Sequence, residues 1–351
     1  MTYGSLPSNP FVAAGMIEDS RLFVGREDEL QAIASRMTGA QPTSINIIGD
    51  QHIGKSSLLH HFWETWEQRV QDSSRFAVIY LSLRDGDCQT EIGFYEAVAQ
   101  GLPNLVSGWQ KWLNNALKAK SLNRQGFSDA IKQWKQQGKL PVICLDDFES
   151  LLKHPQEFDN GFYDNLRSLM DDNALMLVIA SRKTLKIYGS EHRFVSGFFN
   201  IGHSLSLEEL TTDDAIKLVR LSTGSVPVLS IDEQNCAQRW GKRHPYKLQL
   251  AGYYLVEARQ RGKSVKWAKQ QFDNQLADFQ PKAKQWRWLR WVVWDLPVRL
   301  GSFTKFLGAS VGEVTNWVMG IGILLMLVLV FAGVLHWNDV WDFVRDKLGI
   351  K

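Results

Sequence analysis

Eight residues near the start of the chain constrain its fold more than any other feature. Residues 49–56, Gly-Asp-Gln-His-Ile-Gly-Lys-Ser, match the pattern G-x-x-x-x-G-K-[ST] in full. A short apolar run at 44–48 precedes them, and a segment with helical periodicity follows at once. The order of strand, loop and helix predicts a phosphate-binding loop that presents backbone N–H groups to an anion at the helix N-terminus.

The residues of this loop have distinct expected roles. The glycines let the backbone wrap around phosphates, Lys55 places a cation on the β and γ oxygens, and Ser56 offers a hydroxyl to Mg²⁺. The candidate cofactor-binding residues of the segment are Gly49, Asp50, Gln51, His52, Ile53, Gly54, Lys55, Ser56 and Ser57.

Three further apolar runs, at 76–83, 140–145 and 175–180, predict strands that alternate with helical stretches. Such alternation is typical of an α/β fold in which a parallel sheet carries helices on both faces. We therefore predict a P-loop NTPase sheet, whose ligand lies at the carboxyl ends of the strands.

Charged residues follow two of these strands. Asp146 comes directly after the strand at 140–145, where an acid is typical of a Walker B strand that holds Mg²⁺ through water. Asp147, or alternatively Glu149, would orient the attacking water, and the sequence leaves that choice open. Arg182 follows the next predicted strand and would sense the γ-phosphate, with a solvated loop arginine as the alternative. The candidate metal ligands are thus Ser56 and Asp146, and the candidate catalytic residues are Asp147, Glu149 and Arg182.

Residues 206–280 are predicted to be all-helical. Thr211 and Asp214 have the spacing of a capping box ahead of an apolar helical face. A second helix carries leucines and tyrosines between residues 248 and 255. We expect these helices to form a lid subdomain that follows the sheet.

The C-terminal part of the chain contains a long uncharged segment. No Asp, Glu, Lys or Arg lies between residues 314 and 338, and the residues at 317–337 are almost all apolar. As a helix they would span about 31 Å, which matches a hydrocarbon core of about 30 Å. Tryptophan at both ends is typical of the membrane interface. The pattern predicts one C-terminal transmembrane helix.

A basic and aromatic segment precedes that helix. Residues 282–305 contain six basic side chains and one acid, Asp295, and four tryptophans lie between 286 and 294. The positive-inside rule places residues 1–316 in the cytoplasm. The composition fits aromatic rings at headgroup depth with guanidinium groups on anionic lipid. A strip that binds single-stranded nucleic acid is the alternative.

Composition excludes several other classes of protein. With 44% hydrophobic and 22% charged residues among 351, the chain is neither globally disordered nor a rod. Its three widely spaced cysteines cannot build a disulfide framework or a metal cluster, which favours a reducing compartment. The N-terminus lacks a basic region followed by an apolar core, so we expect no secretory signal.

Several motifs resemble one family when they are taken in order. Besides the P-loop, they are residues 9–11 (NPF), 22–27 (LFVGRE), 145–149 (LDDFE), 181–182 (SR) and 241–250 (GKRHPYKLQL). This set is similar to the AAA-like ATPases of the STAND class, which are related to archaeal-type and NACHT/NB-ARC proteins. The resemblance covers about residues 9–260.

The resemblance implies further roles for particular residues. Val24 and Arg26 would lie where the family packs its 22–27 segment against the adenine of ATP. His244 and Pro245 would report the nucleotide state from the lid, and Arg182 resembles the sensor arginine of the family. Together with the patterns described above, these roles predict six parts of the chain: a lead-in at 1–20, a P-loop ATPase core at 21–205, a helical lid at 206–280, a basic-aromatic juxtamembrane segment at 281–316, a transmembrane helix at 317–337 and a tail at 338–351.

These expectations combine into a membrane-anchored switch that binds ATP with Mg²⁺, hydrolyses it, and couples nucleotide state to partner binding or self-assembly. The family more often has Asp-Glu where this chain has Asp146-Asp147, and the shorter carboxylate implies slower hydrolysis. A nucleotide-binding membrane scaffold with negligible turnover is therefore one alternative, and an oligomerising membrane effector of the defence type is another. The expected partners are ATP, the lipid bilayer, an unidentified protein and further copies of the chain as a homo-oligomer; we do not expect nucleic acid.

Overall fold

Five parallel strands form the sheet at the centre of the fold. The computed structural model describes residues 9–101, 123–201 and 203–279. The strands are β1 Ile45–Ile48, β2 Phe76–Ser82, β3 Leu140–Asp146, β4 Met176–Ser181 and β5 Ser204–Ser206. Their order across the sheet is β2-β3-β4-β1-β5, with every neighbouring pair parallel. The parallel α/β fold is confirmed, and the four longer strands agree with the predicted ones to within one residue at each end.

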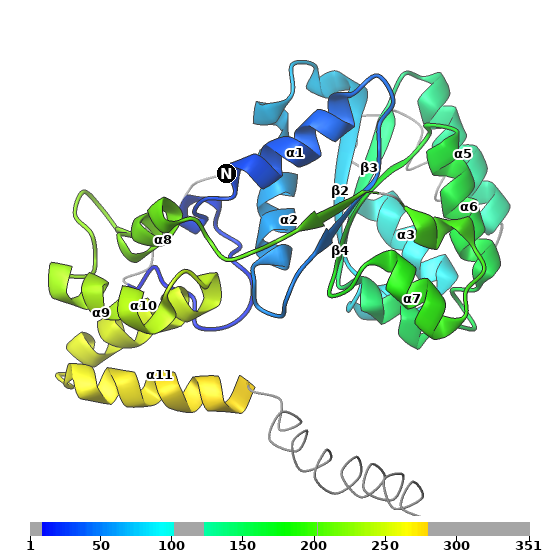
Figure 1. The fold of residues 1–351 in the computed structure, drawn as a ribbon. Helices are drawn as coiled ribbons and strands as arrows, with labels where there is room; N and C mark the ends of the chain where they lie inside the picture. Colours follow the sequence, from blue (N-terminus) through cyan, green and yellow to red (C-terminus); the bar gives the residue numbers. More distant parts are fainter. Residues whose placement is uncertain (1–8, 102–122, 202, 280–351) are drawn as a thin grey trace, which may run out of the picture. The chain divides into compact units, whose positions relative to one another are not determined.

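Helices cover both faces of this sheet (Figure 1). One face carries α1 Glu27–Thr38 and α2 Lys55–Thr65, and the other carries α3 Glu91–Gly101, α5 Arg124–Gln136, α6 Asn160–Asp171 and α7 Leu185–His192. Along β3, Val142 and Cys144 pack in the core beneath α1 and α2, whereas Ile143 and Leu145 pack in the opposite core. Because both faces are buried, the strands are continuous apolar runs, which is why the sequence could reveal them.

The segment that follows β5 is helical, as predicted, and we call its helices the lid. Its helices are α8 Thr212–Val219, α9 Ile231–Gly241, α10 Pro245–Gln260 and α11 Val265–Phe279. The first three pack against one another. At the start of α8, the Thr211 hydroxyl accepts from the backbone N–H of Asp214. The Asp214 carboxylate accepts from that same hydroxyl instead of from the backbone N–H of Thr211, so only half of the predicted capping box forms.

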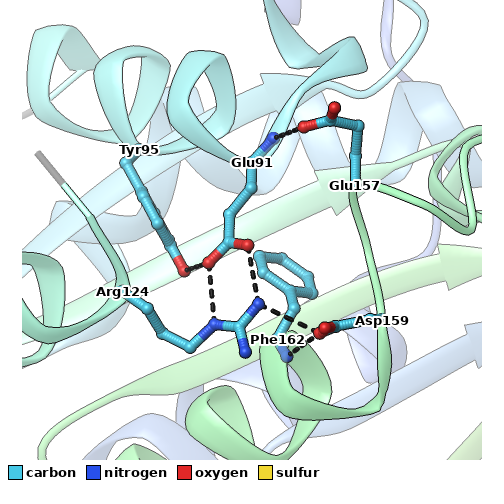
Figure 2. Close-up of polar contacts among 6 residues, drawn as sticks. All are labelled: Glu91, Tyr95, Arg124, Glu157, Asp159 and Phe162. Carbon is cyan, nitrogen blue, oxygen red and sulfur yellow. Dashed lines mark hydrogen bonds and ion pairs between the residues drawn. The ribbon is translucent and has the colours of Figure 1, made fainter.

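One arginine joins the starts of three helices on the α3 side of the sheet (Figure 2). Arg124, the first residue of α5, donates to both carboxylate oxygens of Glu91 at 2.8 and 2.7 Å, and to Asp159 at 2.9 Å. Glu91 is the first residue of α3 and Asp159 is the N-cap of α6. The Tyr95 hydroxyl also donates to Glu91, and the backbone N–H of Glu91 donates to Glu157. Since each carboxylate has a donor, we interpret this cluster as structural.

None of the described helices is long and apolar enough to cross a membrane. The predicted juxtamembrane segment at 281–316, the transmembrane helix at 317–337 and the tail lie outside the described residues. The pocket and the contacts around it, described below, all lie within the unit Met1–Phe272.

Candidate nucleotide-binding site

The loop between β1 and α2 has the backbone geometry that an anion site needs. Gly54 has φ +99°, a left-handed conformation that L side chains rarely adopt, and α2 begins at the next residue. A Cβ at Gly49 would approach both the Ile53 side chain and the Leu207 carbonyl oxygen to 2.9 Å. The two glycines therefore allow the tight turn that brings the N-terminus of α2 to the loop.

Lys55 lies over the loop that precedes it. Its Nζ donates to the carbonyl oxygens of Gly49 and Asp50, both at 2.8 Å. Burial lowers the pKa of the Lys55 ammonium, while the nearby carboxylate of Glu149 acts in the opposite direction. The ammonium is thus held by neutral acceptors beside the pocket, and phosphate oxygens would be stronger acceptors for it.

The two predicted metal ligands lie in contact. The Ser56 hydroxyl donates to Oδ1 of Asp146 at 3.0 Å, although 90 residues separate them. Strand β3 ends at Asp146, which is only 5% exposed, and a second hydroxyl, from Tyr80, donates to its Oδ2 at 3.0 Å. Burial and the neighbouring Asp147 raise the pKa of Asp146, and the two hydroxyl donors oppose that shift.

This donor set fits Mg²⁺. Hydroxyl and carboxylate oxygens are hard ligands, and Mg²⁺ is usually held by one or two carboxylates together with waters and substrate phosphates. Within the described ranges, no group of three or more His, Cys, Asp or Glu side chains could hold a metal by itself. Ser56 and Asp146 would therefore hold the ion together with a bound nucleotide.

The two candidate bases differ in their surroundings. Asp147 has φ +56° and lines the pocket, and its carboxylate forms an ion pair with Arg84, at 2.7 Å from Nε and 2.9 Å from Nη2. Glu149 is not among the lining residues, and its Oε1 accepts from the backbone N–H of Arg182 and from the Tyr188 hydroxyl. The geometry therefore favours Asp147 over Glu149 as the residue that faces a bound phosphate.

The end of β4 reaches the same edge of the sheet. Arg182 follows Ser181, the last residue of β4, and lines the pocket with an exposed side chain. Asn46 in β1 is fully buried, and its Nδ2 donates to Ser181 Oγ at 2.7 Å and to the Ile179 carbonyl oxygen. This side chain joins β1 to β4, which are neighbouring strands in the sheet. The phosphate loop follows β1 and Arg182 follows β4, so both lie at the same edge of the sheet.

The remaining wall of the pocket is mostly apolar. The cavity is about 430 Å³ in volume. Its lining beyond the loop and the strand ends comes from the N-terminal segment and the lid: Val12, Gly15, Met16, Ile17, Leu22, Phe23, Val24, Leu210, Leu218, Pro245, Tyr246 and Gln249. Val24, expected beside the adenine, and Pro245, expected to report the nucleotide state from the lid, are both among the lining residues.

Two hydrogen bonds attach the N-terminal segment to the rest of the site. The backbone N–H of Val12 donates to Oε1 of Gln249 in α10 at 3.0 Å, and that of Ile17 donates to Ser57 Oγ in α2 at 2.9 Å. A Cβ at Gly252 in α10 would collide with the Phe11 ring, at 2.4 Å. Residues 11–17, part of the predicted lead-in, thus bridge α10 of the lid and α2, the helix of the phosphate loop.

Arg26 is placed differently from the neighbouring Val24. It lines the pocket, but it adopts φ +66° before α1, and its buried guanidinium donates to Glu29 and to the carbonyl oxygens of Ile53 and Glu208. The described contacts of Arg26 thus tie the phosphate loop to the start of the lid.

The lid also reaches the phosphate loop through aromatic rings. His52 of the loop stacks on Tyr246 of α10, with ring centroids 4.8 Å apart and planes inclined by 29°. His244 is the N-cap of α10 but is not among the lining residues, and its buried Nδ1 has no hydrogen-bond partner among the described residues. Burial lowers the pKa of both histidines.

Several residues of the site were not predicted from the sequence, among them Tyr80, Arg84, Tyr246 and Gln249. Tyr80 lies within an apolar strand, where an aromatic residue is read as core, and Arg84 lies in a segment without a diagnostic spacing. Tyr246 and Gln249 lie in the 241–250 segment that carries the family resemblance, but the roles implied there were those of His244 and Pro245. The 241–250 segment is thus the signal that could have indicated Tyr246 and Gln249, whereas the position of Tyr80 beside Asp146 depends on the strand order.

Comparisons with known proteins show the family through one family model and the fold through solved structures. A family model described as Novel STAND NTPase 1 matches residues 13–228. The ORC2 protein of Aeropyrum pernix, solved as ADPNP-ADP complexes, is 12% identical with a TM-score of 0.55, over 94% of this chain and 90% of that one. The Walker-type ATPase PABY2304 of Pyrococcus abyssi is 14% identical with a TM-score of 0.51, over 86% and 89%. No curated protein sequence matches the chain. At these identities the structural similarities show the fold.

Proposed function

This chain belongs to the novel STAND NTPase 1 family, and from that premise we propose that it is an ATP-binding, ATP-hydrolysing switch anchored to a membrane. The family match agrees with the resemblance that the sequence motifs indicated. The observation that carries the nucleotide part of the proposal is the contact between Ser56 and Asp146 beside the loop that holds Lys55. Mg²⁺ bound at those two oxygens would supply positive charge opposite the β- and γ-phosphates.

Adenine is the base that best suits the apolar wall. Guanine presents an adjacent ring N–H and amino group, which proteins commonly pair with a carboxylate. The carboxylates that line the described pocket are Asp146 and Asp147, both at the strand ends. The wall formed by residues 12–24 and by the lid offers apolar side chains and the Gln249 amide. These surroundings support ATP over GTP.

Hydrolysis requires a group that orients water toward the γ-phosphate. We assign that role to Asp147, which lines the pocket together with the cationic side chains of Arg182 and Lys55. In the structure the Asp147 carboxylate is already paired with Arg84, whose side chain is 63% exposed. We expect this ion pair to keep basal turnover low, and Arg84→Ala to raise the rate of phosphate release about threefold.

The same ion pair supports a second candidate function. A carboxylate held by an arginine does not orient water, so the chain would then bind ATP as a membrane scaffold with negligible turnover. Phosphate release separates the two functions. No release by either the wild type or Arg84→Ala, together with intact ATP binding, would favour the scaffold.

The contacts around the pocket would connect a bound nucleotide to the lid helices. Arg26 joins the loop to the start of the lid, Tyr246 stacks on His52, and Gln249 holds the N-terminal segment. A nucleotide that fills this pocket would touch all of these groups, so its phosphate state would bias the arrangement of the lid. The proposed output is binding of a protein partner or of further copies of the chain.

Membrane anchoring rests on the sequence alone. The uncharged segment at 317–337 and the basic residues at 282–305 support one membrane-spanning helix with the ATPase domain in the cytoplasm. We expect the full chain to remain in the membrane fraction after a carbonate wash. The double substitution Leu325→Arg/Leu329→Arg should release it, because each arginine costs about 2.5–3.5 kcal/mol at a helix centre on insertion scales. Val226→Arg, at a residue 71% exposed in the described lid, is the matched control.

A binding titration tests the nucleotide part of the proposal. Fluorescent ATP analogue should bind the full chain in the presence of Mg²⁺, and Lys55→Ala should weaken binding roughly 100-fold, because Lys55 makes charge-assisted contacts with phosphate. Lys266→Ala, which removes an exposed lysine of α11, should leave binding unchanged. Equal affinities for wild type and Lys55→Ala would contradict the proposal.

A further inference from the structure

Tyr80 is an aromatic residue of the central sheet that touches the predicted metal ligand. It lies in β2, in register with Cys144 of β3, two residues before the end of its strand. Its hydroxyl donates to Oδ2 of Asp146 at 3.0 Å and lies 3.5 Å from the sulfur of Met16. The residue is half-buried and lines the nucleotide pocket. A phenol at the edge of a phosphate site can act on the metal, on the nucleotide, or only on packing.

The ring of Tyr80 is held by two other elements. His60 and Trp63 of α2 flank it, with ring centroids 5.5 and 6.1 Å away. Met16 belongs to the N-terminal segment that lines the apolar wall. Helix α2 begins at Lys55, so the same helix that carries the phosphate-binding residues also fixes the position of the phenol.

The two oxygens of Asp146 consequently have separate partners. Ser56 donates to Oδ1, and Tyr80 donates to Oδ2 on the opposite side of the carboxylate. A carboxylate rotates easily about its last bond, and a donor on one oxygen restricts that rotation. Groups that hydrogen-bond a metal ligand orient it, and their loss typically weakens metal affinity by about 10–100-fold.

We propose that Tyr80 is a positioning residue for the metal site: its hydroxyl fixes Asp146 so that Oδ1 faces Ser56 and the Mg²⁺ of a bound nucleotide. The inference rests on the proposed function, since it concerns the same site. Through Met16, Tyr80 also links this carboxylate to the segment that lines the apolar wall. One side chain therefore contacts both the predicted metal ligand and a residue of the apolar wall.

The test measures how nucleotide binding depends on Mg²⁺, without requiring turnover. Full-length wild type and Tyr80→Phe are titrated with a fluorescent ATP analogue in EDTA and then with increasing Mg²⁺. We expect affinities in EDTA to agree within about twofold, and the Mg²⁺ concentration for half-maximal effect to rise about 10-fold in Tyr80→Phe. The ring that packs against α2 is retained in this variant, so the fold should be preserved.

Tyr163→Phe is the matched control. The Tyr163 hydroxyl is buried and has no hydrogen-bond partner among the described residues, so its removal should leave the Mg²⁺ dependence unchanged. An unchanged Mg²⁺ dependence in Tyr80→Phe as well would overturn the inference and leave Tyr80 as a packing residue. Wild-type protein that binds no nucleotide would instead contradict the proposed function.

A double-mutant cycle distinguishes positioning from a direct contact with the ligand. If Tyr80 acts through Asp146, then Tyr80→Phe should have no further effect on Mg²⁺ dependence in an Asp146→Asn background. Direct measurement of bound Mn²⁺ by electron paramagnetic resonance gives the same comparison if either variant binds the analogue poorly. If the change in Mg²⁺ dependence of the double variant equals the sum of the changes in the two single variants, the inference is contradicted.

Discussion

The two ends of the pocket are built in different ways. The phosphate end consists of one continuous loop, 49–56, together with residues that follow β3 and β4. The base end is assembled from residues 12–24, 210–218 and 245–249, which are far apart in the sequence. The first is held by backbone geometry and the register of parallel strands, whereas the second is held by a few side-chain contacts between separate segments. This difference suggests that the base end can open while the phosphate end keeps its shape.

The largest effect is expected from a change that deforms the phosphate end itself. In Gly49→Ala, the added Cβ would meet the Ile53 side chain and the Leu207 carbonyl oxygen at 2.9 Å, so the loop must move. We expect ATP affinity to fall roughly 100-fold, because the backbone N–H groups of the loop and Lys55 would no longer all be oriented toward the phosphates. Calorimetric titration with ATP measures this affinity. Gly86→Ala, where nothing lies near the added Cβ, is the control. Equal losses in both variants would contradict a specific role for the turn.

A smaller effect is expected at the base end. Gln249→Ala removes the acceptor of the Val12 N–H and releases the N-terminal segment from α10. One hydrogen bond of this kind is worth about 0.5–1.5 kcal/mol, so affinity should fall between twofold and about tenfold. The loss should be the same for ATP, ADP and AMP, whereas Lys55→Ala should affect ATP and ADP far more than AMP. A Gln249→Ala loss confined to ATP would contradict the separation of the two ends.

The smallest effect on nucleotide binding is expected from the cluster around Arg124 that Figure 2 shows. None of its residues lines the pocket. Arg124→Ala leaves Glu91 and Asp159 without their shared cation, so the free energy of unfolding should fall by about 1–3 kcal/mol. ATP affinity should remain within twofold of wild type. Chemical denaturation and the binding titration report the two quantities separately. A large loss of affinity at unchanged stability would show that this side of the sheet communicates with the site.

Features set by local pattern could be predicted from the sequence. The loop, the four longer strands and the meeting of Ser56 with Asp146 all follow from a motif, from apolar runs and from the shared edge of parallel strands. The short strand Ser204–Ser206 was missed because it has three residues, two of them exposed serines, and so no apolar run.

Features set by distant contacts could not be predicted. Val12 and Gln249 are 237 residues apart, and nothing in either segment indicates its partner. The ion pair of Arg84 with Asp147 depends on β2 and β3 being neighbours, which requires the strand order. Tyr80 was read as core because its ring does pack there, and only its hydroxyl reaches the site. The sequence thus predicted most of the phosphate end, whereas at the base end it indicated Val24 and Pro245 and the other lining residues came from the structure.

The most direct test of the central claim is phosphate release by the full chain in anionic liposomes, beside Lys55→Ala and Asp147→Asn. The account predicts Mg²⁺-dependent release by the wild type that both substitutions reduce by about 100-fold or more, since one removes the cation on the phosphates and the other the carboxylate that orients water. Release that continues at the wild-type rate in Lys55→Ala would contradict it.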